Sequence, residues 1–192
     1  MELKIEPSRT ALVVIDLQHG IVANPAAPHD PKDVVARSAQ IARALRAAGG
    51  TVVLVHVTPS QDGKDGLKPI ADATARTWGG APPPDWSDIV PELEPESAHV
   101  IITKRQWGAF YGTELDLQLR RRGIDTIILC GIATTIGVES TARDAYERGY
   151  QQIFVEDAMS ARTAEEHAYA VSTLFPRIGR VRSTADVVAA LK

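Results

Sequence analysis

The sequence contains a single cysteine, Cys130, so no disulfide bond can form within the chain. Its 192 residues are nevertheless enough to bury an adequate core without disulfide or metal staples. Disulfides are rare in the reducing cytoplasm, and we expect a cytoplasmic protein. The length also suits one domain, which we predict to cover residues 1–192.

Long apolar runs and a strong charge of one sign are absent as well. No apolar stretch approaches the ~20 residues that a membrane helix needs, and the N-terminus lacks the apolar centre of a signal peptide. The net charge is −3, with acids and bases interspersed. The one basic run, at residues 120–122, is typical of the charged last turn of a helix. We therefore expect neither nucleic acid nor a membrane as a partner.

Short apolar segments alternate with helical patterns along the whole chain. Strands are predicted at residues 11–15, 51–57, 99–103, 126–130, 153–157 and 180–182, and helices at about 30–48, 113–122, 141–149, 163–175 and 183–191. The first helix has the clearest signals, with Asp30 as its N-cap and Pro31 at its first position. The alternation predicts a parallel sheet with helices on both faces, and six strands suggest the order 3-2-1-4-5-6.

The segment from residue 58 to about residue 98 has no strong periodicity and is punctuated by glycine and proline. Segments of this length in compact domains are usually lids or interface elements, and a disordered linker is the alternative. Trp78 and Trp86 favour packing against the rest of the protein. A short helix is predicted at about 85–93.

Polar side chains stand at the carboxyl ends of the first three predicted strands, namely Asp16, His56 and Lys104. In a sheet of this order, ligands bind beyond the carboxyl ends where the strand order reverses, between strands one and four. Ordinary strand-end charges are the alternative for Asp16 and Lys104, but their shared position favours a site. His56 is better explained as a packed, hydrogen-bonded residue. No neighbouring residues have metal-ligand spacing, so we expect no metal.

The fourth strand leads into residues 131–137, the turn Gly-Ile-Ala-Thr-Thr-Ile-Gly, which precedes a predicted helix. Unpaired amide groups collect at a helix start, where the helix dipole favours negative charge. Small residues let a substrate approach the backbone closely. We therefore predict that this turn forms the floor of an active site. Cys130 lies on the strand side of the turn, where a buried core thiol is expected rather than a nucleophile.

Three motifs occur in order along the chain: Val14-Ile15-Asp16-Leu17-Gln18, Lys104-Arg105-Gln106-Trp107-Gly108-Ala109-Phe110 with Gly112-Thr113, and the stretch from Gly131 to Arg143. With these motifs, almost the whole chain resembles the isochorismatase-like hydrolase family, also called the cysteine hydrolases. The resemblance implies a Rossmann-like three-layer α/β/α sandwich with a mostly parallel, six-stranded sheet. The family's usual triad is Asp, Lys and Cys. Asp16 and Lys104 match the first two, whereas Gly137 stands at the nucleophile position.

Glycine cannot form a covalent intermediate, so the resemblance implies a hydrolase that works without one. True isochorismatases also lack the cysteine, and they cleave a vinyl ether with the Asp as general acid. By this resemblance Asp16 protonates the substrate, Lys104 binds a substrate carboxylate or developing oxyanion, and no cofactor is needed. The alternatives are a catalytically silent binding homologue and a thiol amidase that lacks its nucleophile at Gly137.

Further residues are expected to contact the small-molecule substrate. They are Gln18, Trp107, Phe110, Ala133, Thr134 and Thr135. Core packing is the alternative for the aromatic residues that follow Lys104, including Tyr111. The resemblance also implies a non-proline cis peptide at Ala133–Thr134 or at the bond before it. With the long segment 58–98, it suggests a homodimer or homotetramer.

Overall fold

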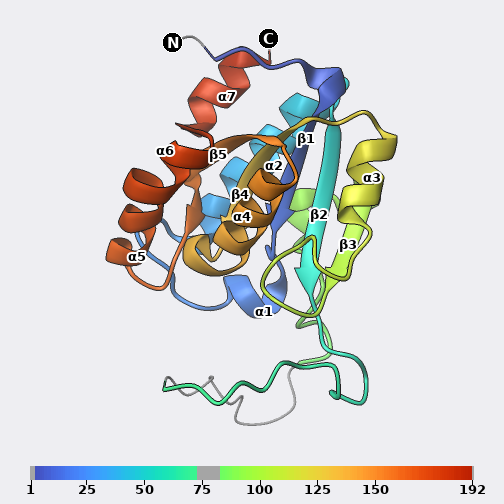
Figure 1. The fold of residues 1–192 in the computed structure, drawn as a ribbon, viewed down its shortest axis with the longest axis vertical. Coiled ribbons are helices and arrows are strands. Elements are labelled where there is room, and N and C mark those ends of the chain that lie inside the picture. Colours follow the sequence, from blue (N-terminus) through green and yellow to red (C-terminus); the bar gives the residue numbers. More distant parts are fainter. Residues whose placement is uncertain (1–2, 73–82, 192) are drawn as a thin grey trace.

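A sheet of six parallel strands forms the centre of the protein in a computed structural model that describes residues 3–72 and 83–191 (Figure 1). The strands are β1 (Thr10–Ile15), β2 (Thr51–Val57), β3 (Val100–Lys104), β4 (Thr126–Ile132), β5 (Gln151–Ser160) and β6 (Arg180–Arg182). Their order is β3-β2-β1-β4-β5-β6, which confirms the predicted order. Every pair is parallel, so the sheet is wholly rather than mostly parallel. The order reverses between β1 and β4.

The central strand β1 shows why the sheet is covered on both sides. All six of its residues are buried. Successive side chains of a strand point to opposite faces. Val13 and Ile15 accordingly join one apolar cluster, and Leu12 and Val14 join the other. The residues of β1 are apolar without alternation because each face of the strand packs into its own apolar core.

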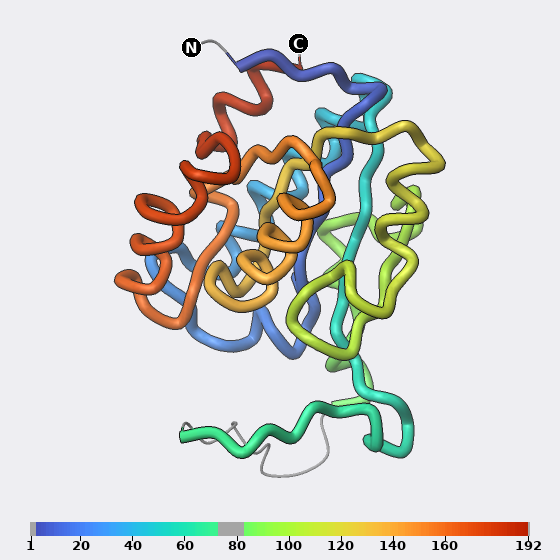
Figure 2. Tube along the Cα trace, in the orientation of Figure 1, coloured from blue at the N-terminus to red at the C-terminus, as the bar shows by residue number. Residues whose placement is uncertain are grey.

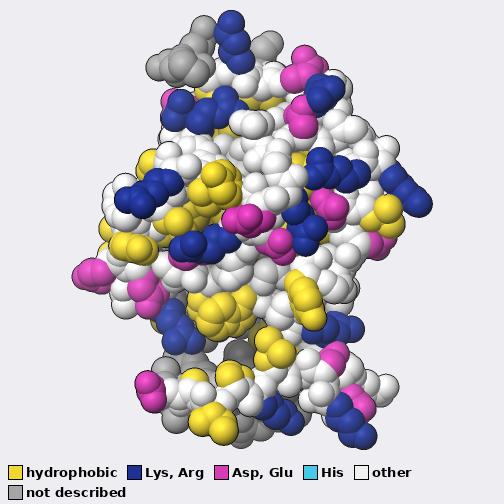
Figure 3. All heavy atoms as spheres, viewed as in Figure 1, with side chains coloured by type: hydrophobic (Ala, Val, Ile, Leu, Met, Phe, Trp, Pro, Cys, Tyr) yellow, Lys and Arg dark blue, Asp and Glu magenta, His cyan; other side chains and the backbone are white. Residues whose placement is uncertain are grey.

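Helices cover both faces of the sheet and complete the three layers (Figure 1). On one face lie α2 (Pro31–Ala47) and α7 (Thr184–Ala190), and on the other lie α3 (Leu115–Arg121), α4 (Glu139–Glu147) and α6 (Phe175–Ile178). The predicted N-cap of α2 is confirmed, because Asp30 accepts a hydrogen bond of 2.8 Å from the amide of Lys32. None of the described helices is long and apolar enough to cross a membrane. Figure 3 shows acidic and basic side chains interspersed over the viewed face.

Two helix predictions need correction. The helix predicted at 163–175 is α5 (Ala164–Tyr169), followed by a π-helical turn (Ala170–Leu174) and α6. Pro176 lies in the first turn of α6 rather than beyond a helix end, a place where a missing N–H is tolerated. In the range 85–93, where a helix was predicted, the structure has a turn at 84–87 and a 3₁₀ turn at Pro91–Leu93.

Residues 58–72, which follow β2, extend beyond the carboxyl ends of the strands in Figure 2. Residues 73–82, with Trp78, lie outside the described residues. Trp86, in contrast, is anchored beside the short helix α1 (His19–Val22). Its carbonyl accepts a hydrogen bond of 2.9 Å from the amide of Gly20, and its ring fills the space where a side chain at Gly20 would stand. The expected packing of Trp86 is therefore confirmed.

Candidate active site

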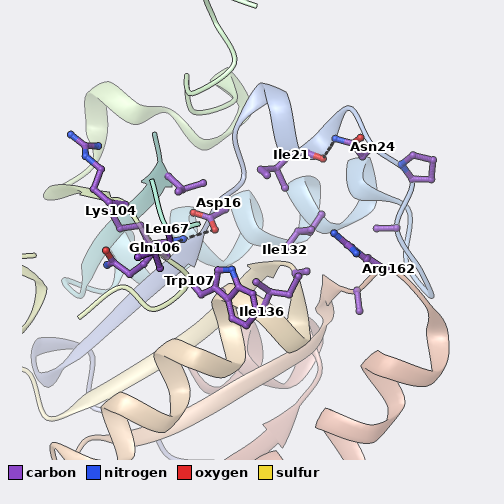
Figure 4. Close-up of a pocket in the computed structure, with 17 residues that line it drawn as sticks. Asp16, Ile21, Asn24, Leu67, Lys104, Gln106, Trp107, Ile132, Ile136 and Arg162 are labelled. Carbon is purple, nitrogen blue, oxygen red and sulfur yellow. Dashed lines mark hydrogen bonds and ion pairs between the residues drawn. The ribbon is translucent and has the colours of Figure 1, made fainter. Parts of the chain in front are cut away.

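A pocket of about 520 Å³ opens at the carboxyl ends of β1, β3 and β4, next to the point where the strand order reverses (Figure 4). Its described lining includes Asp16, Lys104, Trp107, Ala133, Gly137 and Arg162. These residues come from parts of the chain that are far apart in sequence. Parallel strands bring them together, because their carboxyl ends all meet at one edge of the sheet.

Asp16 and Lys104 form a buried ion pair in this pocket. Lys104 Nζ donates to Asp16 Oδ2 at 2.8 Å, and the side chains are only 1% and 8% exposed, respectively. The ammonium also donates to the carbonyl of Gln106 at 3.0 Å. Asp16 Oδ1 is buried and has no hydrogen-bond partner within residues 3–72 and 83–191. A buried acceptor left in this state is a natural contact for a substrate hydroxyl, amide or water.

Burial makes the Asp16 carboxyl a weaker acid than an exposed aspartic acid. Desolvation raises the pKa of its carboxyl from 3.8 to about 6, although the neighbouring Lys104 ammonium opposes the rise. The residue also has a left-handed backbone, with φ at 54°. Its amide donates to the carbonyl of Val55 at 2.9 Å, which ties this uncommon conformation to β2. Asp16 can therefore exchange a proton near neutral pH from a firmly held position.

Gly137 lies directly beside the ion pair, in the π-helical turn Thr134–Val138 that precedes α4. A Cβ atom added to Gly137 would lie 3.1 Å from Asp16 Oδ2 and 2.8 Å from Ile15 Cγ2. The first carbon of any side chain at position 137 would thus be in contact with the Asp16 carboxylate. The Ile15 methyl group occupies part of the space that such a side chain needs.

The turn between β4 and α4 has the predicted cis peptide, at Ile132–Ala133, the earlier of the two bonds considered. The predicted row of free amide donors is only partly present. The amides of Ile136 and Val138 both donate to the carbonyl of Ala133, at 3.1 and 3.2 Å. The π-helical turn closes on that carbonyl, so the amide of Ile136 is already used.

Comparison with known proteins assigns the chain to a family. Residues 10–186 match the isochorismatase domain. The chain belongs to the isochorismatase family. It is 50% identical over 191 residues to the "uncharacterized isochorismatase family protein YwoC" of Bacillus subtilis (strain 168), covering 99% of this chain and 98% of that protein. The structure of an isochorismatase family protein from Burkholderia thailandensis matches with a TM-score of 0.93 and 46% identity, covering 100% and 99% of the two chains.

A more distant relative has a named activity. The chain is 29% identical over 224 residues to the ureidoacrylate amidohydrolase RutB of Methylobacterium radiotolerans, covering 98% of this chain and 82% of that protein. The close relative YwoC is named by family alone. Within the family, the activity of this chain therefore has to be argued from its own pocket.

Gln18 was expected to bind substrate, and the structure of this isochorismatase-family protein contradicts that expectation. Its side chain is fully buried and does not line the pocket. Its amide group accepts from the amide of Val57 at 2.8 Å and donates to the carbonyls of Val57 at 3.0 Å and Trp86 at 3.2 Å. The hydrogen-bonding groups of the Gln18 side chain are therefore engaged by the backbone, and they hold the end of β2 in place.

The three aromatic residues after Lys104 have different environments. Trp107 lines the pocket, as expected, although its side chain remains largely exposed. Phe110 is 4% exposed and packs against Tyr150 with 5.7 Å between the ring centroids, so core packing is its actual role. Tyr111 is 76% exposed and lies outside the pocket lining.

In the turn after β4, only Ala133 of the three residues expected to bind substrate lines the pocket. Thr134 is fully buried and faces away, with its hydroxyl 2.9 Å from Nδ1 of His167. Thr135 is not part of the described lining either. The hydroxyl of Thr134 is thus directed to His167 and not to the cavity, while substrate contact by Thr135 stays a prediction.

Two alternatives considered from the sequence are confirmed. His56 has both ring nitrogens engaged, with Nδ1 2.7 Å from the carbonyl of Ser87 and Nε2 2.8 Å from the hydroxyl of Thr103. Cys130 is fully buried, and burial raises the pKa of its thiol to about 12. The thiol therefore stays protonated and behaves as a core residue.

Arg162 is the most informative pocket residue that the sequence did not reveal. It follows the carboxyl end of β5 and lies across the pocket from Lys104 (Figure 4). The strand-end rule that selected Asp16 did not reach it, because the fifth strand was predicted to end at residue 157 whereas β5 extends to Ser160. Among the described lining residues, Lys104 is paired with Asp16 and Arg105 with Asp65 at 2.8 Å, whereas no ion pair is described for Arg162. The pocket therefore favours anionic ligands.

Proposed function

We propose that this protein is a hydrolase that cleaves a vinyl ether, or a related C–O or C–N bond, in a small carboxylate-bearing substrate without a covalent enzyme intermediate. One observation carries the proposal. A carboxyl group with a pKa of about 6 stands beside a position, Gly137, that offers no nucleophile. Asp16 then acts as the general acid, and water is the nucleophile.

Lys104 controls when Asp16 is protonated. The ammonium lowers the pKa of Asp16, so a substrate carboxylate that binds Lys104 cancels part of this effect. The pKa of Asp16 then rises above 6 in the complex, and the carboxyl gains its proton when substrate arrives. This arrangement couples substrate binding to the supply of the catalytic proton.

Hydrolysis of a vinyl ether needs no reactant other than water. Asp16 delivers its proton to the terminal carbon of the double bond, which leaves a positive charge shared by the adjacent carbon and the ether oxygen. Water adds to that carbon and loses a proton. The resulting hemiketal breaks its C–O bond to give a ketone and an alcohol, and Asp16 ends protonated again through exchange with water.

Arg162 supports the assignment to an anionic substrate. Figure 4 shows its guanidinium directed toward the cavity, on the side away from the ion pair. A guanidinium binds carboxylates through two parallel hydrogen bonds. A substrate with one acidic group at Lys104 and another at Arg162 would span the pocket and fix the reacting bond near Asp16.

The experiment is a turnover assay of the purified protein with isochorismate, simple enolpyruvyl ethers and small amides. We expect hydrolysis of an ether that is lost in Asp16→Asn and in Lys104→Ala. Asp125→Asn, at the opposite end of the sheet, is the matched control. Full turnover by Asp16→Asn on a confirmed substrate would show that the mechanism is wrong.

The amidohydrolase relative supports a second candidate, an amidase chemistry whose nucleophile is missing at Gly137. Gly137→Cys tests it, combined with Ile15→Leu, which removes the methyl group that the new Cβ would meet. Amide hydrolysis gained by this double variant favours the second candidate. A third outcome is no turnover of any ether or amide together with thermal stabilisation by small carboxylates. That result identifies a binding homologue without catalysis.

A further inference from the structure

Two histidines and a glutamate converge beside the pocket, from parts of the chain that are far apart in sequence. They are His29 in the loop before α2, Glu156 in β5 and His167 in α5. One candidate ligand atom from each lies within 4.8 Å of the other two. His29 Nε2 is 3.6 Å from Glu156 Oε2. None of the three is among the described residues that line the pocket.

An irregularity in β5 places Glu156. The pairing of β4 with β5 runs to Leu129–Phe154 and resumes at Gly131–Met159, so β5 contains three extra residues between these pairs. Such bulges redirect side chains and are common next to functional sites. Glu156 lies within this stretch, and its side chain is 38% exposed.

Separate contacts hold the two histidines. Two hydrogen bonds hold the backbone of His29 at the end of β5. Its amide donates to the hydroxyl of Ser160 at 3.1 Å, and the same hydroxyl donates to its carbonyl at 2.9 Å. His167 is 4% exposed, and its Nδ1 is 2.9 Å from the Thr134 hydroxyl. The backbone of His29 is therefore fixed at β5, and its ring packs edge-on against the ring of His167 with 5.7 Å between the centroids.

The cluster leaves a buried polar atom unsatisfied. His29 Nε2 has no hydrogen-bond partner among the described residues, and the nearest Glu156 oxygen is beyond hydrogen-bond distance. A buried nitrogen in this state needs an explanation.

The spacing and chemistry suit a first-row divalent cation. Zinc binds histidine nitrogen and carboxylate oxygen at roughly 2.0–2.2 Å in a tetrahedron, which sets ligand atoms about 3.4 Å apart. The 3.6 Å separation of His29 and Glu156 is close to this value, and small rotations of the side chains would bring in His167. Magnesium and calcium prefer oxygen ligands, so two imidazoles disfavour them.

We propose that His29, Glu156 and His167 form a binding site for Zn²⁺ or a similar first-row divalent cation, separate from the pocket. The site leaves a fourth position for water, since His29 and Glu156 are partly exposed. The hydroxyl of Thr134 lies 2.9 Å from Nδ1 of His167 and would accept a hydrogen bond from it when Nε2 binds the cation, in the way that outer-sphere partners orient metal ligands. Because Thr134 begins the turn that carries Gly137, the bound cation also restrains one wall of the pocket.

The test uses the full chain after treatment with a chelator, titrated with ZnCl₂ against a chromophoric competitor and by calorimetry. We expect one equivalent of tight binding and a higher Tm. His29→Ala, Glu156→Gln and His167→Ala should each weaken binding at least about tenfold, because each removes one ligand. Co²⁺ should give the visible absorption of a four-coordinate site.

The matched control is His19→Gln. His19 Nδ1 lies 2.9 Å from Asp85 Oδ2, so it is also a histidine beside a carboxylate, but it is not part of the cluster. Its substitution should leave the affinity for Zn²⁺ unchanged. Glu156→Gln keeps the size of a partly exposed side chain and should fold. If His167→Ala fails to fold, the Zn²⁺ affinity of Glu156→Gln therefore tests the site. Absence of saturable binding, or binding that none of the three substitutions weakens, overturns the proposal.

Discussion

Two carboxylate–cation pairs lie at opposite ends of the same central strands. Asp16 and Lys104 meet beyond the carboxyl end of β1, while Arg9 and Asp125 meet where β1 and β4 begin. The first pair has side chains 8% and 1% exposed, and the second has side chains 61% and 43% exposed. The pKa of Asp16 is raised to about 6, whereas that of Asp125 is lowered.

The difference shows that burial, and not the presence of a cation, decides what a carboxylate can do in this protein. At Asp125 desolvation is again the largest single influence, but the hydrogen bonds from Arg9 and Thr126 and the charge of Arg9 together outweigh it and lower the pKa. At Asp16 desolvation is the largest influence and Lys104 offsets it only in part. Of these two carboxylates, Asp16 is therefore the one that can transfer a proton near neutral pH.

The largest difference between the two ends is expected in catalysis. Asp16→Asn should lower kcat/KM on a confirmed ether substrate by about 1000-fold, because it removes the general acid. Asp125→Asn should change it by less than about twofold, because the exposed pair is remote from the pocket. Steady-state kinetics measure both, and circular dichroism checks that both variants are folded. Similar losses in the two variants would contradict a catalytic role that is specific to Asp16.

The next largest difference is expected in stability. Lys104→Met should reduce the free energy of unfolding by about 3 kcal/mol near pH 8, because it leaves Asp16 buried without its partner. Removing Lys104 raises the folded-state pKa of Asp16 further above 3.8, so the stability linked to its proton is present at low pH and lost as pH rises. Urea unfolding should therefore show a smaller deficit near pH 5.

Two controls accompany that measurement. Arg9→Met should reduce the free energy of unfolding by less than about 1 kcal/mol, since an exposed pair contributes little. The double variant Asp16→Asn with Lys104→Met should recover much of the lost stability, because no unpaired charge is left buried. Equal losses for Lys104→Met and Arg9→Met would remove the distinction between the two ends.

The pH dependence of turnover should reflect the raised pKa of Asp16. A general acid must be protonated, so kcat/KM should be level below about pH 6 and fall about tenfold per pH unit above it. A thiol route in the Gly137→Cys and Ile15→Leu variant requires ionised Asp16 and should show a rising profile instead. Kinetics from about pH 5 to about pH 8 measure this. A rate that rises through pH 6 in the protein with Gly137 unchanged would exclude the acid role.

A smaller effect is expected at the far wall of the pocket. Arg162→Gln should raise KM about tenfold, roughly 1.4 kcal/mol, and leave kcat within about twofold, because it removes binding but not proton transfer. Arg143→Gln is the matched control, since Arg143 is 57% exposed and paired with Glu139 on the surface of α4. An unchanged KM in Arg162→Gln would show that the substrate does not reach this side.

Much of the fold and the centre of the candidate site could be predicted from local patterns. β-branched runs alternating with capped helices predict a parallel sheet, and its polarity places Asp16, Lys104 and the turn at 131–137 at one edge. Gln18 and Phe110 lie in the same motifs but were wrongly predicted to bind substrate. Their side-chain directions depend on neighbours in space, which local patterns do not specify.

The sequence by itself determined the alternation of strands and helices and the residue types at the strand ends, because periodicity and caps act over a few residues. Only the tertiary structure decided the acidity of Asp16, since desolvation depends on everything packed around it. It alone brought Arg162 across the pocket and gathered His29, Glu156 and His167. These residues meet only after the layers have packed and β5 has bulged, and no local pattern encodes that packing.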